Sequence, residues 1–184
     1  MAVETQDIKT TSSPDEGADI AAQTAKYLSF FLGDEEYALG ILSVREIIGL
    51  IDITPLPQTP DYVKGVINLR GKIIPVIELR AKFGLDSVEY TDQTCVIVVE
   101  VGNESTDQHF EIGIIVDSVR EVLDIAGSQI DPPPSFGCSV PLDYITGIGK
   151  VREKVVVLLN IDRIVTSAEA EKLLGTTNTN DVPA

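Results

Sequence analysis

The chain has 184 residues, of which 43% are hydrophobic, enough for one domain or two small ones with a packed core. Its formal net charge of −15 disfavours nucleic acid and anionic membranes as partners, because like charges repel. Aromatic residues make up only 5% and Trp is absent, so Val, Ile and Leu must fill the core, and these residues favour strands.

The N-terminal part of the chain predicts a disordered tail followed by a β-hairpin. Residues 1–25 form an acidic stretch rich in Thr, Ser, Asp and Ala, without an apolar period. Residues 27–32 and 36–41 then alternate as two strands around a turn. The next segment, residues 43–50, fits a strand or a short helix equally well, because its apolar residues match both periods.

A second hairpin, at residues 65–77, carries the most specific pattern in the chain. Two β-branched runs meet at Arg70 and Gly71, and Asn68, Arg70 and Lys72 place a polar corner on an otherwise apolar ribbon. Pro75 cannot donate a backbone hydrogen bond, so its strand is expected at a sheet edge or at a bulge. Residues 59–62 predict one helical turn before this hairpin, and residues 79–83 predict another after it.

The second half predicts more strands and a closing helix. Thr166 and Glu169 have the spacing of a capping box, Gly175 is a suitable helix end, and residues 176–184 form a loose tail. A polar loop is expected at 102–109 and an extended, proline-rich one at 131–134. The predicted strands are 94–101, 110–116, 120–125, 144–148 and 155–160.

The two halves repeat one another in order and spacing. Residues 37–41 match 110–114, and residues 43–48 match 118–123. Gly65 and Lys72 fall on Gly147 and Lys154 in the same way. The repeat predicts a mainly all-β fold of two packed, five-stranded β-barrels, the first at residues 26–86 and the second at 87–175, with an approximate boundary.

The corner at Arg70 differs between the two copies. The second copy has Lys150 and Arg152 in place of Asn68 and Arg70, on what we interpret as a longer and more polar loop. Because the second barrel folds without this corner, we infer that Arg70 serves a function rather than the fold.

The sequence offers little support for catalysis. Cys95 and Cys138 have no CxxC spacing, and the one histidine, His109, stands in a polar segment, so neither a zinc or redox motif nor a catalytic relay can be drawn. We therefore expect no enzyme activity, no cofactor and no metal. No signal peptide or membrane-spanning run is recognised, which predicts a cytoplasmic protein.

Five segments together resemble the CheW family of bacterial chemotaxis proteins. They are Phe-Phe-Leu-Gly-Asp-Glu-Glu-Tyr (30–37), Val-Arg-Glu-Ile (44–47), Thr-Pro-Asp-Tyr-Val-Lys-Gly-Val-Ile-Asn-Leu-Arg-Gly (59–71), Ile-Pro-Val-Ile-Glu-Leu-Arg (74–80) and Val-Asp-Ser-Val-Arg-Glu-Val-Leu (116–123). The resemblance covers residues 27 to about 174. It implies two tandem SH3-like barrels forming a non-catalytic adaptor, which couples the cytoplasmic tips of chemoreceptors to the histidine kinase CheA and is recruited to membrane receptor arrays.

The resemblance also implies where the receptor hairpin binds. The second barrel resembles the part that packs on the regulatory domain of CheA, although no contact residue can be assigned there. Four of the implied residues also have another reading. Val44 and Ile47 could be barrel core, Glu46 could form a structural pair with an Arg, and Arg70 could pack along its own hairpin. The implied receptor-binding residues are Val44, Glu46, Ile47, Val66, Asn68 and Arg70.

Two other functions stay open from the residues. The cleft between the barrels could hold a small ligand of the purine type, although no phosphate loop or aromatic sandwich is present. A barrel that binds nucleic acid would need a basic aromatic face, which the charge of −15 opposes.

Overall fold

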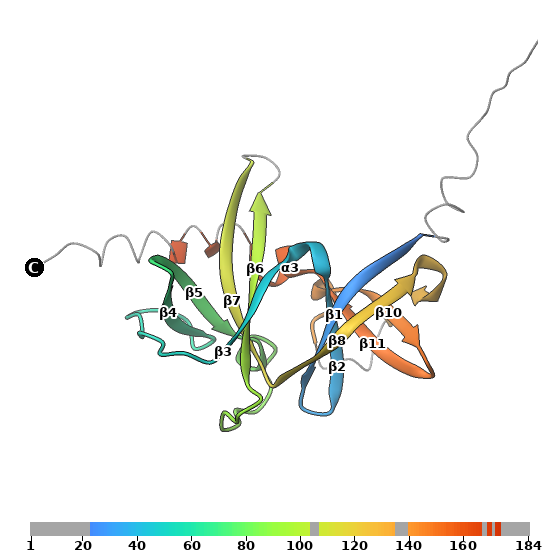
Figure 1. Ribbon diagram of the computed structural model, residues 1–184, viewed down its shortest axis with the longest axis horizontal. Helices are drawn as coiled ribbons and strands as arrows, with labels where there is room; N and C mark the ends of the chain where they lie inside the picture. Colours follow the sequence, from blue (N-terminus) through green and yellow to red (C-terminus); the bar gives the residue numbers. More distant parts are fainter. Residues whose placement is uncertain (1–22, 104–106, 135–139, 167–168, 171, 174–184) are drawn as a thin grey trace, which may run out of the picture.

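The computed structural model describes residues 23–103, 107–134, 140–166, 169–170 and 172–173. Its strands form two sheets, which curl into two barrels and appear as two lobes in Figure 1. Helices are short here, as in α2 (Leu79–Lys82) and α3 (Ile161–Ile164). The mainly β fold of two SH3-like barrels is thus confirmed.

The two sheets have six and five strands. The six-stranded sheet has the order β8 (Ser118–Ala126), β1 (Thr24–Leu32), β2 (Glu35–Gly40), β11 (Lys154–Leu159), β10 (Ile145–Val151) and β9 (Ile130–Asp131). The five-stranded sheet has the order β3 (Val44–Gly49), β6 (Cys95–Asn103), β7 (Gln108–Val116), β5 (Lys72–Glu78) and β4 (Val63–Leu69). We call these the six-stranded and the five-stranded barrel.

Each barrel combines strands from both sequence repeats. β1 and β2 of the first repeat pair with β8 and β11 of the second, while β6 and β7 of the second pair with β3 and β5 of the first. The joins on β2 and β7 are parallel ladders, Val157 beside Tyr37 and Val76 beside Gly113. The division expected near Asp86 therefore separates the repeats but not the barrels.

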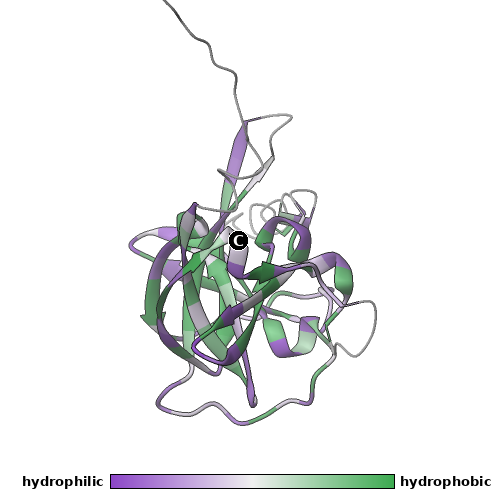
Figure 2. Ribbon diagram, turned by 90° about the vertical axis from the view of Figure 1, so that its right-hand side faces the viewer, coloured by the Kyte–Doolittle hydropathy of each residue, from purple (hydrophilic) through white to green (hydrophobic). Residues whose placement is uncertain are grey.

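Three cores hold this arrangement together. Within the strand run 96–99, Val96 and Val98 face the interior of the five-stranded barrel, whereas Ile97 and Val99 face a central core shared with the other barrel. Such strands are apolar on both faces because both faces are buried. Figure 2 shows the six-stranded barrel, where hydrophobic residues mix with hydrophilic ones along the outer strands. Its own interior is formed by Ala38, Leu123, Ile125, Val156 and Leu158.

The central core contains a row of aromatic rings from several elements. Phe30 and Tyr37 stack with centroids 6.0 Å apart, Tyr37 and Phe83 lie 5.9 Å apart, and Phe83 and Tyr144 lie 5.8 Å apart. Offset or tilted pairs at such distances add to the free energy gained from burial. The row crosses from β1 and β2 to the segment after α2, so it fixes the two barrels against each other.

Several local predictions differ from the structure. β6 and β7 extend into the polar loop expected at 102–109, since β6 ends at Asn103 and β7 begins at Gln108. Residues 59–62 form only a hydrogen-bonded turn, in which the Val63 amide donates to the Pro60 carbonyl (2.9 Å), because β4 begins too soon for a helix to nucleate. β5, which contains Pro75, is an interior strand and not an edge, and the irregularity in its ladder with β4 falls between Val63 and Gly65 and not at Pro75. Its partner Val66 exchanges both backbone hydrogen bonds with Thr54 instead, and the β7 ladder begins only at Val76, so the missing amide of Pro75 is tolerated.

The segment after α3 begins with the predicted capping box. The Glu169 amide donates to Thr166 Oγ1 (3.2 Å), and the Thr166 amide donates to Glu169 Oε2 (3.0 Å). Leu173 and Ala170 then pack on the central core. The expected helix end at Gly175, the C-terminal tail, residues 1–22 of the expected N-terminal tail and Cys138 lie outside the described residues. The last two residues of that expected tail, Thr24 and Ala25, belong instead to β1, where they pair with β8. Within the described ranges, no helix is both long and apolar enough to cross a membrane.

Candidate docking corner

The corner of the β4–β5 hairpin is a two-residue turn with both residues in the left-handed region. Arg70 has φ 54° and Gly71 has φ 86°, the signs of a type I′ turn, whose twist matches that of the flanking strands. The Asn68 side chain accepts a hydrogen bond from the Gly71 amide at 2.9 Å, which holds the turn closed. The guanidinium of Arg70 is left projecting from the turn, with its side chain 73% exposed.

An ion pair joins this corner to the opposite edge of the same sheet. Arg70 Nη2 donates to Glu46 Oε1. Glu46 lies on β3 and the corner follows β4, the two edge strands of the five-stranded barrel. The pair therefore bridges the seam where the sheet closes into a barrel, above Ile48 and Leu69, which pack on the barrel interior. The sequence-based suggestion that Glu46 pairs with an arginine is confirmed, and that arginine is Arg70.

The six predicted receptor-site residues are not equally available to a partner. Ile47 on β3 is 45% exposed, and Asn68 is exposed beside Arg70. Val44 is half-buried against the central core, and Val66 is only 9% exposed beneath its bridge to Thr54. The structure thus brings Glu46, Asn68 and Arg70 together at the seam, with Ile47 next to Glu46 on the outer face of β3.

Two further side chains at this corner were not among the predicted site residues. Lys72 forms an ion pair with Glu111 of β7 (3.2 Å), and Ile73 is a large apolar side chain left 43% exposed on β5. Ile73 pairs with Asn68 across the hairpin. The alternation of β5 could have singled it out, since Ile73 must face away from the neighbouring buried Ile74.

A second polar cluster, the inter-barrel latch, consists of Arg80, Asp117 and the Gly33 amide. Arg80 Nε and Nη2 donate to the two carboxylate oxygens of Asp117 (2.8 and 2.6 Å), and the Gly33 amide donates to Asp117 Oδ2 (2.7 Å). The hydrogen bond from Arg80 lowers the pKa of Asp117, and the same bond raises the pKa of Arg80. Arg80 belongs to the five-stranded barrel and Gly33 to the six-stranded one, so the latch ties the two together.

A third cluster holds the C-terminal segment against the five-stranded barrel. Glu169 accepts from the Tyr62 hydroxyl (2.8 Å) and from Lys82 Nζ (3.1 Å), and Lys82 lies 4.0 Å from the centre of the Tyr62 ring. Burial alone would raise the pKa of Glu169, but hydrogen bonds from Thr166, Tyr62 and Lys82 lower it overall. No group of His, Cys, Asp and Glu that could hold a metal ion occurs in the described part of the chain.

Comparison with known proteins shows which family has this architecture. The CheW-like domain model matches residues 26–169, which is most of the chain. The chain belongs to the CheW family. Chemotaxis protein CheW of Klebsiella aerogenes is 41% identical over 144 residues, covering 78% of this chain and 83% of that protein. Chemotaxis protein CheW of Helicobacter pylori is 36% identical over 143 residues, covering 77% and 82%.

A solved CheW structure supports the same conclusion. The scaffolding protein TtCheW from Thermoanaerobacter tengcongensis has a TM-score of 0.70 and 33% identity, covering 80% of this chain and 96% of that protein. Both lines of comparison lead to proteins of chemotaxis, one of them described as a scaffold. This CheW-family chain is accordingly a chemotaxis coupling adaptor, from a family of non-catalytic scaffolds.

The corner of the second repeat in this CheW-family chain differs from the prediction. β10 ends at Val151 and β11 begins at Lys154, so the loop has two residues, as in the first repeat, and is not longer. Arg152 and Glu153 have φ 49° and 66° and form the same kind of turn. An arginine at this corner is thus common to both repeats, and what differs is the surroundings of that arginine.

Proposed function

We propose that this chain couples the cytoplasmic hairpin of chemoreceptors to the regulatory domain of the kinase CheA, with the Arg70 corner as the receptor-binding site. The observation that supports this site is the exposed cluster of side chains where the edge strands β3 and β4 meet. Arg70 is strongly exposed although it is held by Glu46, and it lies beside exposed Asn68 and Ile73. An arginine fork with apolar neighbours suits an acidic helical partner, since the fork binds carboxylates in two-point fashion.

The rigid connection between the barrels supports the mechanism. An adaptor transmits a change from one partner to the other only if its own two binding surfaces keep a fixed relation. Here the shared core and the inter-barrel latch provide that relation. The chain would then act in the cytoplasm, recruited to receptor arrays at the membrane. Neither the comparisons nor the described residues favour a purine-type ligand as an alternative.

Arg70→Glu tests the receptor site. Binding of a purified receptor hairpin fragment should weaken at least ten-fold, whereas binding of the CheA regulatory domain should stay within two-fold of wild type. Lys26→Glu is a matched control, because Lys26 is an exposed, ion-paired cation on the six-stranded barrel. Unchanged receptor binding in Arg70→Glu would refute the assignment.

A charge swap separates contact with a partner from closure of the barrel. Arg70→Glu places two carboxylates at the seam, so the single variant alone could act by loosening β3. In the double variant Glu46→Arg with Arg70→Glu, the ion pair is restored in reverse. If Arg70 contacts the receptor, binding stays weak in the swap; recovery of binding would mean that the seam matters and not the arginine itself.

A further inference from the structure

The two barrels have the same strand order once the second repeat is laid over the first. We call β1 to β5 with α2 the first repeat, and β6 to β11 with α3 and the segment after it the second repeat. If β6, β7, β8, β10 and β11 are matched to β1, β2, β3, β4 and β5, the order β8-β1-β2-β11-β10 becomes β3-β6-β7-β5-β4. This is the order found in the five-stranded barrel. Each repeat thus gives its first hairpin to one barrel and its remaining strands to the other.

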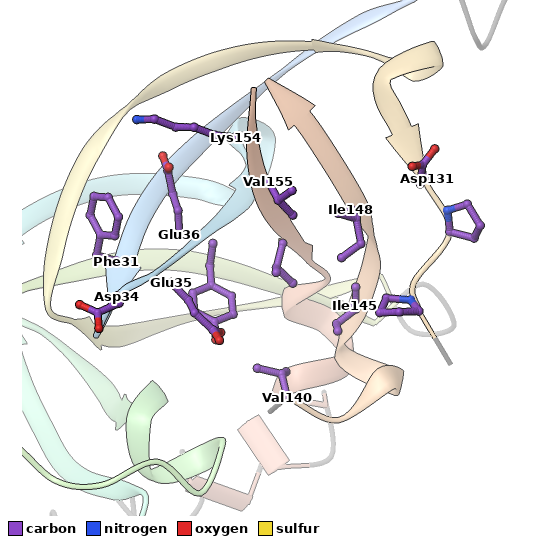
Figure 3. A pocket seen from close by; sticks show the side chains of 14 residues that line it. Phe31, Asp34, Glu35, Glu36, Asp131, Val140, Ile145, Ile148, Lys154 and Val155 are labelled. Carbon is purple, nitrogen blue, oxygen red and sulfur yellow. The ribbon is translucent and has the colours of Figure 1, made fainter. Parts of the chain in front are cut away.

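Neither repeat closes a barrel by itself in this fold. In the described part of the chain, four ladders join strands of different repeats, β1 with β8, β2 with β11, β3 with β6, and β5 with β7. Figure 3 shows one such junction, where Glu36 of the first repeat and Val155 and Ile148 of the second line the same groove. A repeat on its own would leave all of these strand edges unpaired.

The polar clusters that hold the molecule together also pair groups of different repeats. In the inter-barrel latch, Arg80 and the Gly33 amide belong to the first repeat, and Asp117 belongs to the second. In the cluster at the C-terminal segment, Lys82 of the first repeat donates to Glu169 of the second. Each of these contacts can form equally well when the two repeats come from different chains.

The chain passes from the first repeat to the second once, through a linker at residues 84–93. These residues form turns but no helix or strand, and they are exposed except for the half-buried Leu85. The linker therefore adds no strand to either barrel. When extended, a linker of this length reaches about 35 Å, which is enough to lead from one folded body into another. Nothing in the two barrels requires both repeats to belong to the same chain.

We propose that a second copy of this chain is a binding partner, and that two copies exchange their second repeats to form a dimer. Each body of the dimer has the first repeat of one copy and the second repeat of the other, with the same ladders and the same core as the monomer. Only the linkers differ, because they cross between the two bodies. The proposal goes beyond the proposed function, because it names a further partner.

Protein concentration sets the balance between monomer and dimer, since both forms bury the same surfaces. A short flexible linker holds the two repeats of one chain at an effective concentration of about 1 mM, so the dimer competes only when folding occurs near that concentration. Once formed, the dimer exchanges slowly with the monomer, because opening a body breaks the four ladders between its repeats.

The exchange doubles the Arg70 corner. Glu46 and Arg70 both belong to the first repeat, so each body of the dimer has a complete corner. Two corners on one dimer bind neighbouring receptor hairpins with greater avidity than one corner does. This consequence rests on the proposed function, whereas the exchange itself does not.

Two cysteines on facing strands of different repeats test the exchange in the full chain. Lys26 of β1 lies directly opposite Asp124 of β8, and both side chains are exposed. In a background with Cys95→Ala and Cys138→Ala, the variant Lys26→Cys with Asp124→Cys brings two thiols within reach of a disulfide. In the monomer this disulfide closes within one chain. In the exchanged dimer it joins two chains, and a dimer held only by surface contact does not give that product.

The matched control is Lys150→Cys with Val155→Cys in the same background, because these residues lie opposite each other within the second repeat. Both variants are unfolded in urea, refolded at about 1 mM or about 10 µM, oxidised, and analysed on a non-reducing gel. At the higher concentration we expect roughly a third of the Lys26→Cys, Asp124→Cys chains as covalent dimer, and at the lower less than about 5%. The control should give no covalent dimer at either concentration.

Two results would overturn the exchange: disulfides that close only within the chain at both concentrations, or as much covalent dimer in the control as in the test variant. If the cysteine variant does not refold, wild type is refolded at about 1 mM with a reducing agent, diluted to about 10 µM and measured by light scattering. A dimer that persists after dilution supports the exchange, and monomer alone refutes it. Receptor binding is measured separately on the monomer, so failure of the exchange leaves the coupling function standing, and failure of receptor binding leaves the exchange standing.

Discussion

Removing the charge of Asp117 should destabilise the protein out of proportion to the size of the change. Asp117→Asn keeps the shape of the side chain, but it loses the charged hydrogen bonds from Arg80, whose side chain is only 12% exposed. Loss of one partner from a buried ion pair costs about 3–5 kcal/mol, and a hydrogen bond to a charged group contributes about 1.5–3 kcal/mol. Because Asp117 is partly open to solvent, we expect a loss of about 2–3 kcal/mol.

Urea unfolding at pH 7 measures this loss directly, and a double-mutant cycle with Arg80→Met assigns it to the pair. The coupling between the two residues should be at least about 1 kcal/mol. Asp124→Asn serves as the control, since it also breaks an ion pair of β8, with Lys26 at 2.8 Å, but an exposed one worth less than about 1 kcal/mol. A loss of under about 0.5 kcal/mol in Asp117→Asn, or a coupling near zero, would refute the role of the latch.

The lowered pKa of Asp117 predicts that the loss of stability in Asp117→Asn depends on pH. The pKa of Asp117 is lower in the folded protein than its ordinary value of 3.8, so its charge stabilises the fold above that ordinary value. This contribution is lost as the pH falls through the lowered, folded-state pKa. The difference in unfolding free energy between wild type and Asp117→Asn should therefore be constant near neutral pH and shrink below about pH 4. A difference that grows on acidification would contradict the assignment.

Three further substitutions test the backbone and the C-terminal segment, each by urea unfolding or hydrogen exchange. Gly65→Ala should lower the free energy of unfolding by about 3 kcal/mol or more, because Gly65 has φ +141° and an added Cβ would lie 2.0 Å from the Thr54 carbonyl oxygen. Gly71→Ala should lower it by only about 1 kcal/mol, because an added Cβ at Gly71 meets open space. Glu153→Gly should raise the free energy of unfolding by about 0.5–1 kcal/mol, because Glu153 has φ 66° and glycine adopts this backbone conformation without strain. An unchanged urea midpoint would contradict this. Glu169→Ala should speed amide exchange at Ala170 and Leu173, because it removes the bonds that the Glu169 carboxylate accepts from Thr166, Tyr62 and Lys82. Unchanged exchange at both amides would contradict this.

The sequence predicted the strands well because their signal is local. β-branched runs, turn residues and the capping box of Thr166 depend on neighbours only a few residues away. The one-turn helix at residues 59–62 shows the limit of such signals. Thr59, Pro60 and Asp61 fit a helix start, yet there are too few residues before β4 to repay nucleation.

What the sequence could not show is pairing between distant strands. Because the two repeats resemble each other, β2 would find a matching partner in β5 of its own repeat or in β11 of the other. Local patterns are the same in both cases, and only the packing of the whole molecule decides. The latch was missed for the same reason, since Arg80 and Asp117 are 37 residues apart and the two family segments that contain them do not show that they pair. For the Arg70 corner, the hairpin and its exposed cation were predictable, but the burial of Val66 was not.

The exchange of strands between repeats bears on how an adaptor of this kind can move. The chain crosses from one barrel to the other twice, from β2 to β3 and from β7 to β8 at Asp117. Both parallel ladders, β2 with β11 and β5 with β7, lie within a barrel. Separation of the two barrels is opposed by the latch of Arg80, Asp117 and the Gly33 amide. Opening between barrels would also expose the shared core. The two barrels should therefore move as one body, with the Arg70 corner held in a fixed position relative to the six-stranded barrel.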